Sequence, residues 1–287
     1  MTSARPARGE VRLRGRTFAW GTRTYVMGVV NATPDSFSGD GRPEPGDAIA
    51  HALALVRAGA DIIDVGAEST RPGHTPVAAA EEIRRLDPVV RGIRTAEPGA
   101  VVSVDTYKPE VFGAAHAAGA DVLNSIWGVE GALLEAAVAA GVPVVIMHNK
   151  RVASYEGDVV DEVLGFLAGQ AERAVRAGLA PERVILDPGI GFGKTPDHNL
   201  ALLASLERLT ALGFPTLLGT SRKSTLGKLT GKPVDARTYA SAATVALAVA
   251  AKIDVVRVHD VAEMRDVVDV ADAIVRGRRP ADWTGGA

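Results

Sequence analysis

The stretch DPGIGFGKT, residues 187–195, ends in Gly-Lys-Thr after a run of glycines. A nucleotide-phosphate loop has this ending, but it also needs a glycine five residues before Gly193, so that backbone N–H groups can face the phosphates. Pro188 stands at that position, and proline has a fixed φ and no N–H. The stretch therefore does not predict a phosphate loop, and its acid, Asp187, becomes the candidate functional residue.

Polar side chains recur at the ends of short β-branched runs. Asp105, Asn124 and Asp187 each stand among Val, Ile and Leu residues. Buried carboxylates and amides are costly unless they are paired, so a ligand rich in donors is expected to pair them. A carboxylate can accept two parallel hydrogen bonds from the N–H edge of a flat heterocycle. The alternative is that these residues only end strands and cap helices, as Asp and Asn do in any barrel.

A second set of residues could hold an anion. Arg257 and His259 are two apart on an expected strand, so their side chains share one face, and with Asn31 and Arg71 they form a candidate anion pocket. The sequence holds no His, Asp or Glu cluster with tight metal-ligand spacing. The expected metal is therefore Mg²⁺ held largely by substrate phosphates, rather than a protein-caged Zn²⁺.

Eight short apolar runs carry these residues, each followed by a longer Ala-rich segment with three- and four-residue periodicity. Eight such units predict an α/β fold, a single (β/α)₈ TIM barrel, with its reactive residues at the carboxyl ends of the strands. The rival fold is an open doubly wound sheet, which has a glycine fingerprint after its first strand, where this chain has VVNATPDS. The expected strands are 25–31, 61–67, 101–106, 121–127, 143–149, 184–189, 216–221 and 255–260.

The segment before the first expected strand, VRLRGRTFAWGTRTYV, alternates in polarity and carries a Gly-Thr turn. It predicts a small β-hairpin that closes the bottom of the barrel. No linker or second domain is expected. The predicted division is an N-terminal tail and hairpin over 1–24, the (β/α)₈ barrel over 25–279 and a C-terminal tail over 280–287.

Composition narrows the class of partner. The chain has 287 residues, of which 32 are basic and 34 acidic, so its formal charge of −2 gives no electrostatic case for nucleic acid or an anionic membrane. A small-molecule substrate is expected instead. The absence of cysteine excludes disulfides and thiolate metal sites and fits a cytoplasmic protein. No apolar run reaches the roughly 18 residues of a membrane span.

Six separate motifs lie in order on successive strand ends. They are MGVVNATPDSFSGDG (27–41), GADIIDVGAESTRPG (59–73), SVDTYKP (103–109), LDPGIGFGKT (186–195), GTSRKSTLG (219–227) and RVHDV (257–261). Together they resemble the motifs of dihydropteroate synthase, the folate-pathway family inhibited by sulfonamides. The resemblance covers about residues 25–277 and implies that the expected barrel, 25–279, is a pterin-binding barrel.

The resemblance implies condensation of 6-hydroxymethyl-7,8-dihydropterin pyrophosphate with 4-aminobenzoate, giving 7,8-dihydropteroate and pyrophosphate. It also assigns residues to each subsite. The pterin positions are Asp105, Asn124, Met147, Asp187, Phe192, Gly219 and Lys223. The pyrophosphate positions are Asn31, Arg71, Arg257 and His259, with Mg²⁺ at Asn31. The aminobenzoate positions are Phe37, Thr70, Pro72, Lys223 and Ser224.

The reaction breaks a carbon–oxygen bond to pyrophosphate, so the site must stabilise that anion more than it needs a strong base. The expected catalytic residues are Asp35, Asp105, Lys223, Arg257 and His259. Among them, Asp105 is expected to stabilise positive charge on the exocyclic carbon, and Asp35 to help shield the site from water. The resemblance further implies a homodimer, formed through the late helices around YASAATVALAVAA (239–251).

Two departures from the family pattern leave alternatives open. The first loop reads Ser-Gly-Asp-Gly at 38–41 where Ser-Asp-Gly-Gly is usual, and Ser125 follows Asn124 where an Asp is usual. A diverged paralogue that binds a pterin without turnover is one alternative. The other is a methyltransferase that passes a methyl group from methyltetrahydrofolate to a corrinoid, which is not expected to carry SRKS together with RVHDV because it binds no pyrophosphate.

Overall fold

The computed structural model of the protein describes residues 8–32, 45–68, 76–280 and 283. Eight parallel strands form one sheet in the order β8-β7-β6-β5-β4-β3-β10-β9. A parallel bridge between Leu186 and Thr216 joins the two edges, so the sheet closes into a barrel and the (β/α)₈ prediction is confirmed. The strands are β3 (Tyr25–Asn31), β4 (Ile62–Gly66), β5 (Val101–Asp105), β6 (Val122–Ser125), β7 (Val144–Met147), β8 (Val184–Asp187), β9 (Leu217–Leu218) and β10 (Val255–Val258).

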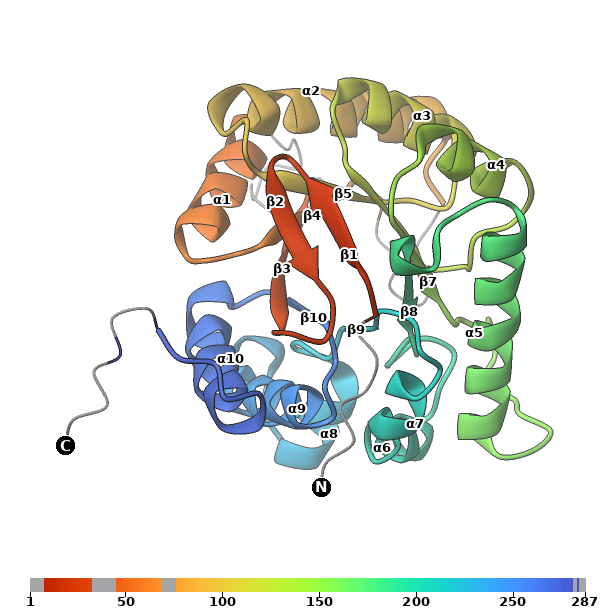
Figure 1. Cartoon of the computed structure of the whole chain (residues 1–287), viewed down its shortest axis with the longest axis vertical. Coiled ribbons are helices and arrows are strands. Elements are labelled where there is room, and N and C mark those ends of the chain that lie inside the picture. Colours follow the sequence, from red (N-terminus) through yellow and green to blue (C-terminus); the bar gives the residue numbers. More distant parts are fainter. Residues whose placement is uncertain (1–7, 33–44, 69–75, 281–282, 284–287) are drawn as a thin grey trace.

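Helices surround the barrel on its outside (Figure 1). Their apolar sides pack on the outward residues of the strands, such as Val26, Val102 and Val256, in one large core. Some of them end at a left-handed glycine, as α3 does at Gly119 and α4 at Gly141. The helices are α1 (Pro45–Arg57), α2 (Ala79–Ala96), α3 (Pro109–Ala118), α4 (Gly131–Ala140), α5 (Val159–Arg176), α6 (Pro196–Leu203), α7 (Leu206–Thr210), α8 (Ser224–Thr230), α9 (Thr238–Ala250) and α10 (Val261–Val275), with short 3₁₀ turns at Pro181–Arg183 and Val234–Ala236.

The predicted hairpin is present, formed by β1 (Glu10–Leu13) and β2 (Arg16–Ala19). Its turn is Arg14-Gly15, where both residues have positive φ, as a two-residue hairpin turn requires. The predicted Gly-Thr turn, Gly21-Thr22, lies instead between β2 and β3. The hairpin therefore turns at Arg14-Gly15, which precedes the expected Gly-Thr turn in the chain.

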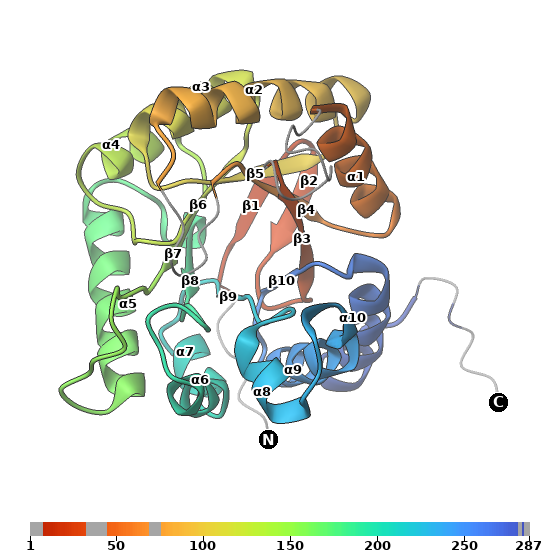
Figure 2. The same ribbon diagram turned by 180° about the vertical axis from the view of Figure 1, so that it is seen from behind.

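The hairpin closes the end of the barrel where the strands begin. Phe18 and Trp20 are almost fully buried and pack with Tyr25, with ring centroids 4.8 Å apart for Phe18–Tyr25 and 5.6 Å for Trp20–Tyr25. They share one interior cluster with the first inward residue of the strands, such as Ile62 and Val101. The hairpin lies in front of the barrel in Figure 1 and behind it in Figure 2, so the opposite end is left for the loops that follow the strands.

Buried aspartates join neighbouring strands at the closed end. Asp61 and Asp121 end two copies of the sequence Ala-Gly-Ala-Asp, and each accepts a backbone hydrogen bond from the adjacent strand, from Val26 at 2.9 Å and Val102 at 3.0 Å. Asp254 acts in the same way before β10. These carboxylates also pair with arginines, so the repeated Asp is explained by barrel stability rather than by the reaction.

We expect Asp254→Asn to lower the free energy of unfolding by about 3 kcal/mol, because every group that faces this fully buried carboxylate is a donor. One oxygen accepts from Gly21 N at 2.7 Å, and the other from Thr216 N at 2.8 Å and from Arg8. An amide would turn an NH₂ group against one of these donors. Urea unfolding measures the effect, with the half-exposed Asp269→Asn as the control. A loss below about 1 kcal/mol would contradict this reading.

Within the described ranges, none of the helices is both long enough and apolar enough to cross a membrane. The cytoplasmic location and the three-part division of the chain stay predictions.

Candidate active site

One ring of inward side chains carries most of the predicted site. Successive residues of a strand point to opposite faces, so the residue two after each interior apolar residue also points into the barrel. In seven strands the first inward residue is apolar, namely Ile62, Val101, Val122, Val145, Ile185, Leu217 and Val255. Two residues further on, the same strands or the positions just after them present Asp64, Ser103, Asn124, Met147, Asp187, Gly219 and Arg257. The inward side chains thus form an apolar layer, the plug, and a mostly polar layer two residues further along the strands, at the mouth of the barrel.

Asp64 pairs with two other members of this ring, and it is not among the residues to which the sequence assigns a role. Its side chain is fully buried. Its Oδ2 accepts a hydrogen bond from Arg257 Nε at 2.7 Å and another from Asn124 Nδ2 at 3.0 Å. Asp64 therefore fixes both a predicted pyrophosphate residue and a predicted pterin residue. The signal that could have identified it is its place in IIDVG, two residues after an interior isoleucine.

Asp105 follows Ser103 by two residues on β5, so it also points into the barrel and extends the polar ring at the mouth. Its Oδ2 lies 3.2 Å from Arg257 Nη2, and the two groups form an ion pair. The other oxygen, Oδ1, is buried and has no hydrogen-bond partner in the described part of the chain. Burial raises the pKa of Asp105 to about 7, and the charge of Asp64 adds to this while Arg257 opposes it. Asp105 thus has one carboxyl oxygen that is free to accept a hydrogen bond from a ligand. Its pKa also allows it to gain or lose a proton near neutral pH.

Asp187 ends β8 and is also buried. Burial raises its pKa to about 6, against the opposing effects of the Gly189 N–H, which donates to Oδ1 at 2.7 Å, and of the charges of Lys223 and Lys194. The loop that follows β8 is formed by the DPGIGFGKT stretch, residues 187–195. Its glycines Gly189, Gly191 and Gly193 all have positive φ, so other residues would be strained there.

Lys223 lies against this loop. Its Nζ is 3.9 Å from the centroid of the Phe192 ring, a cation–π contact, and its stem lies over Gly191, where an added Cβ would come within 3.1 Å of Cδ. Burial and the charge of Arg257 lower the pKa of Lys223 to about 8, while Asp187 and Asp105 oppose that shift. The structure therefore places Phe192 and Lys223 together, as two walls of one subsite.

The segment that carries Lys223 is held by its neighbours. Arg222 adopts a left-handed conformation, with φ of 59°, and its guanidinium pairs with Asp260. Its N–H donates to Ser241 Oγ at 3.1 Å, and its carbonyl accepts from Arg237 Nη1 at 3.0 Å. Gly227 leaves the room for that arginine, because an added Cβ would lie 2.2 Å from the guanidinium. The SRKS segment is thus fixed by contacts that its sequence alone does not reveal.

His259 contacts Ser221 rather than Arg257. Its backbone N–H donates to Ser221 Oγ at 3.2 Å, and its Nδ1 is 3.1 Å from the same oxygen. Burial lowers the pKa of His259 to about 4, and the charges of Arg257 and Arg222 lower it further. The imidazole is therefore neutral at pH 7 in the free protein. Among the described residues of the predicted anion pocket, the positive charge comes from Arg257.

The remaining predicted residues fall into two groups. Asn31, Met147, Gly219 and Ser224 lie at the ends of β3 and β7, just after β9 and at the start of α8; Met147 is buried, Ser224 exposed and the other two intermediate. The predicted residues that lie outside the described ranges are Asp35, Phe37, Thr70, Arg71 and Pro72.

Ser125, one of the two departures from the family pattern, is fully buried beside Asn124. Its hydroxyl donates to the Gly128 carbonyl at 2.7 Å, which fixes the turn after β6. The serine faces away from the ring, and Asn124 keeps its bond to Asp64. The substitution therefore supports the local turn and does not remove the predicted pterin contact. The other departure, at 38–41, lies outside the described residues.

The donor set at the mouth fits Mg²⁺ only with help from a substrate. Across the ranges that the structure describes, no three His, Asp or Glu side chains gather where they could hold a metal ion. A single amide oxygen, that of Asn31, together with phosphate oxygens and water, is a usual Mg²⁺ environment, whereas Zn²⁺ needs a protein cage. The arrangement agrees with a cation that arrives with a pyrophosphate.

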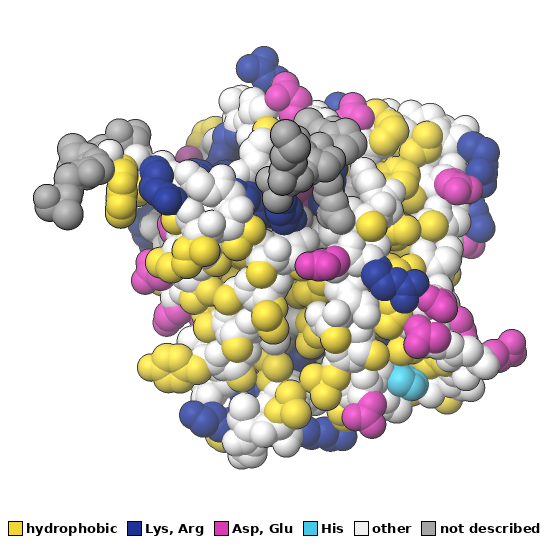
Figure 3. Space-filling view, turned by 60° about the horizontal axis from the view of Figure 1, so that its bottom comes forward, with side chains coloured by type: hydrophobic (Ala, Val, Ile, Leu, Met, Phe, Trp, Pro, Cys, Tyr) yellow, Lys and Arg dark blue, Asp and Glu magenta, His cyan; other side chains and the backbone are white. Residues whose placement is uncertain are grey.

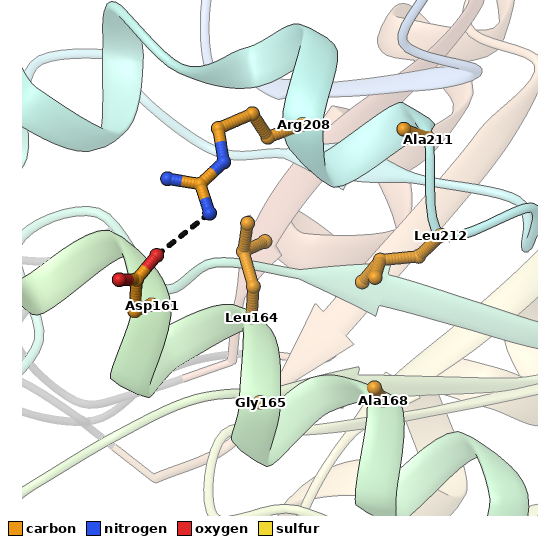
Figure 4. A pocket seen from close by; sticks show the side chains of 7 residues that line it. All are labelled: Asp161, Leu164, Gly165, Ala168, Arg208, Ala211 and Leu212. Carbon is orange, nitrogen blue, oxygen red and sulfur yellow. Dashed lines mark hydrogen bonds and ion pairs between the residues drawn. The ribbon is translucent and has the colours of Figure 1, made fainter.

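A shallow cavity outside the barrel, of about 410 Å³, lies between α5 and the α7 segment (Figure 4). It is lined mainly by apolar or small residues, including Leu164, Ala168 and Leu212. Its two charged residues, Asp161 and Arg208, already pair with each other at 2.6 Å. It presents no array of polar groups comparable to the ring, so the barrel mouth is the candidate active site.

Residues 27–259 match the family described as pterin binding enzyme. The dihydropteroate synthase of Clostridium beijerinckii is 43% identical over 83% of this chain and 89% of that relative. The structure of Xanthomonas albilineans dihydropteroate synthase with 4-aminobenzoic acid is 42% identical and has a TM-score of 0.88. The match covers 94% of this chain and 99% of that one. The same enzyme in complex with 7,8-dihydropteroate is 40% identical with a TM-score of 0.85, over 95% of this chain and 100% of that one.

Proposed function

The chain belongs to the dihydropteroate synthase family of pterin-binding enzymes, and from this premise we propose how its residues carry out the family reaction. The protein is a transferase of folate biosynthesis that condenses 6-hydroxymethyl-7,8-dihydropterin pyrophosphate with 4-aminobenzoate. The observation that carries the assignment of the site is the polar ring above an apolar plug. In it, Asp105, Asn124 and Asp187 offer acceptors and one amide beside the cations Lys223 and Arg257.

The pterin ring is proposed to lie on this polar ring. Asp187 and the unused oxygen of Asp105 accept from its N–H groups, and Asn124, held by Asp64, offers both an acceptor and a donor. Met147, Gly219 and the Phe192–Lys223 wall complete the pocket, and Lys223 and Ser224 border the aminobenzoate. A flat ring with several donors would satisfy carboxylates that are otherwise buried at a cost.

The leaving group is proposed to lie against Arg257, Asn31 and His259. The amine nitrogen of aminobenzoate forms the new bond to the exocyclic carbon, while the carbon–oxygen bond breaks and its electron pair leaves with pyrophosphate. The nitrogen then loses one proton, to a pyrophosphate oxygen or to water. Arg257 stabilises that charge, and the neutral His259 donates a hydrogen bond rather than a charge. Mg²⁺, when bound by Asn31 and the phosphate oxygens, supplies further positive charge to the leaving group.

The function is tested by pyrophosphate release from the purified protein with Mg²⁺ and the pterin pyrophosphate, with and without 4-aminobenzoate. Release that depends on aminobenzoate, with dihydropteroate as the product, is the expected result. Binding of the pterin pyrophosphate by calorimetry without any release would instead identify a diverged pterin-binding protein.

We expect kcat/KM to have a bell-shaped dependence on pH with its maximum between about 7 and 8. On the acid side, Asp105 and Asp187, with pKa values raised to about 7 and 6, take up protons as pH falls and can no longer accept from the pterin as carboxylates. On the basic side, Lys223, with its pKa lowered to about 8, loses its charge as pH rises. Steady-state rates from pH 5 to 10 measure this. A flat profile from pH 5.5 to 9 would show that these groups do not titrate in the free enzyme.

A homodimer is proposed through the late helices. One side of α9 is buried, but Tyr239 and Leu247 are 85% and 58% exposed, and on the neighbouring α10 Val270 and Ile274 are 63% and 78% exposed. Figure 3 shows hydrophobic side chains gathered on the side of the molecule that lies at the bottom of Figure 1, where these helices are. An exposed apolar surface of this kind is typical of a subunit interface. A monomer by gel filtration at micromolar concentration would rule out the dimer.

A further inference from the structure

The loops that follow β7 and β8 are packed backbone against backbone. An added Cβ at Gly189 would lie 2.0 Å from the carbonyl oxygen of His148, and one at Gly193 would lie 2.1 Å from that of Lys150. The His148 N–H also donates to the Asp187 carbonyl at 3.1 Å, and Tyr155 OH donates to the Gly193 carbonyl at 2.9 Å. Glycine is thus required at these two positions because the neighbouring loop occupies the space of a side chain.

Lys194 lies between the two loops and points inward. Its Nζ is 3.0 Å from His148 Nδ1 and donates to the carbonyls of His148 at 3.3 Å and Phe192 at 3.0 Å. An ammonium has three donors, and these three acceptors use all of them. Two acceptors belong to the β7 loop and the third to Phe192 itself. The lysine of the Gly-Lys-Thr triplet therefore binds the protein's own loops and has no donor left for a phosphate.

The charge of Lys194 affects the pKa of Asp187, before the β8 loop, and of His148, in the β7 loop. Burial lowers the pKa of Lys194 to about 7, and Lys223 and Lys150 lower it while Asp187 raises it. In return, Lys194 helps to lower the pKa of Asp187 against burial. Burial and the charges of Lys194 and Lys150 lower the pKa of His148 to about 3, so this imidazole is neutral and its ring nitrogen can accept from the ammonium.

We propose that Lys194 is a positioning residue of the reaction: through its contacts with His148 and Phe192, its Nζ ties the loop after β7 to the loop after β8 and so fixes Phe192, the ring against which Lys223 lies. The inference rests on the proposed function of the site. Removing Nζ frees the Phe192 carbonyl and lets the ring and Lys223 move together. A displacement of about 1 Å at such a site costs about 10²-fold in rate.

The experiment compares Lys194→Met with Lys194→Arg, which keeps the charge and the donors. Both are assayed for aminobenzoate-dependent pyrophosphate release below their melting temperatures. We expect Lys194→Met to lower kcat/KM about 10²-fold, through KM for both substrates as well as kcat, and Lys194→Arg to recover most of that loss. A purely stabilising lysine would lower the melting temperature and leave these constants unchanged.

The matched control is Lys150→Met. Lys150 lies in the same β7 loop, but its Nζ contacts that loop and α5 rather than the β8 loop: it donates to the Ser154 carbonyl at 2.9 Å and to Glu162 at 3.0 Å, and lies 4.2 Å from the Tyr155 ring centroid. It should keep kcat/KM within about twofold. NMR titration of His148 is a readout that needs no turnover: its pKa rises toward its ordinary range when the Lys194 charge is removed.

Calorimetric binding of the pterin pyrophosphate by the same variants tests the positioning role of Lys194 separately from the proposed function. If the wild-type protein binds without turnover, the proposed function fails, while weaker binding by Lys194→Met and recovery by Lys194→Arg still support the positioning role. Unchanged binding, unchanged kcat/KM and an unchanged His148 pKa in a folded Lys194→Met protein would overturn it.

Discussion

Replacing Asp64 by Asn is expected to lower kcat/KM for aminobenzoate-dependent pyrophosphate release by about 10³-fold, equivalent to about 4 kcal/mol. One oxygen of this fully buried carboxylate accepts from both Arg257 and Asn124. The amide has no charge to balance the guanidinium, so Arg257 is left with Asp105 as its carboxylate partner within the described ring. The leaving-group cation and the pterin amide are then both displaced by one substitution.

Asp121→Asn is the matched control, because Asp121 has the same kind of environment at the opposite end of the barrel. It is buried and accepts from Arg94 at 2.8 Å, from Arg14 at 2.6 Å and from the Val102 N–H at 3.0 Å. We expect this variant to lose stability in urea and to keep its kinetic constants at temperatures where it is folded. If Asp64→Asn retains kcat/KM within tenfold of the wild type, Asp64 is a structural residue like Asp121.

The sequence predicts the fold because its signals are local and repeated. Each strand is a short apolar run covered on both faces, and each is followed by an Ala-rich helix, so eight units can be read without knowing any contact. The hairpin is predicted from its alternation. Its turn was placed wrongly because Arg14-Gly15 and Gly21-Thr22 are both glycine turns, and the choice depends on pairing between β1 and β2 that the turn residues alone do not show.

The candidate site is predicted less completely, for a physical reason. Polar residues at strand ends show which groups face the mouth, and Asp105, Asn124 and Asp187 were found in that way. The pairings that fix Asp64, Asp105 and Asn124 join residues 60 to 193 positions apart, such as Asn124–Asp64 and Arg257–Asp64. Lys194 was considered only as a phosphate ligand, because its true partners lie on another loop.

Asp105→Asn is expected to lower kcat about 10²- to 10³-fold, the cost of removing one charge-stabilising group from a water-poor site. KM for aminobenzoate should change little, because the carboxylate is proposed to act on charge that develops at the pterin carbon only as the bond to pyrophosphate breaks. The unused, buried Oδ1 of Asp105 is the atom available for this role.

The pH profile of the same variant separates a charge effect from a loss of shape. Asp105 has the higher pKa of the two carboxyl groups, about 7 against about 6 for Asp187, so its removal should move the acid limb of kcat/KM down by about one pH unit. Asp121→Asn, which changes a buried carboxylate at the closed end of the barrel, should leave both kcat and the limb in place. Normal turnover by Asp105→Asn would show that the carbon's charge is stabilised elsewhere. A reduced kcat with an unmoved acid limb would assign that limb to Asp187, and Asp105 would then act without titrating in the free enzyme.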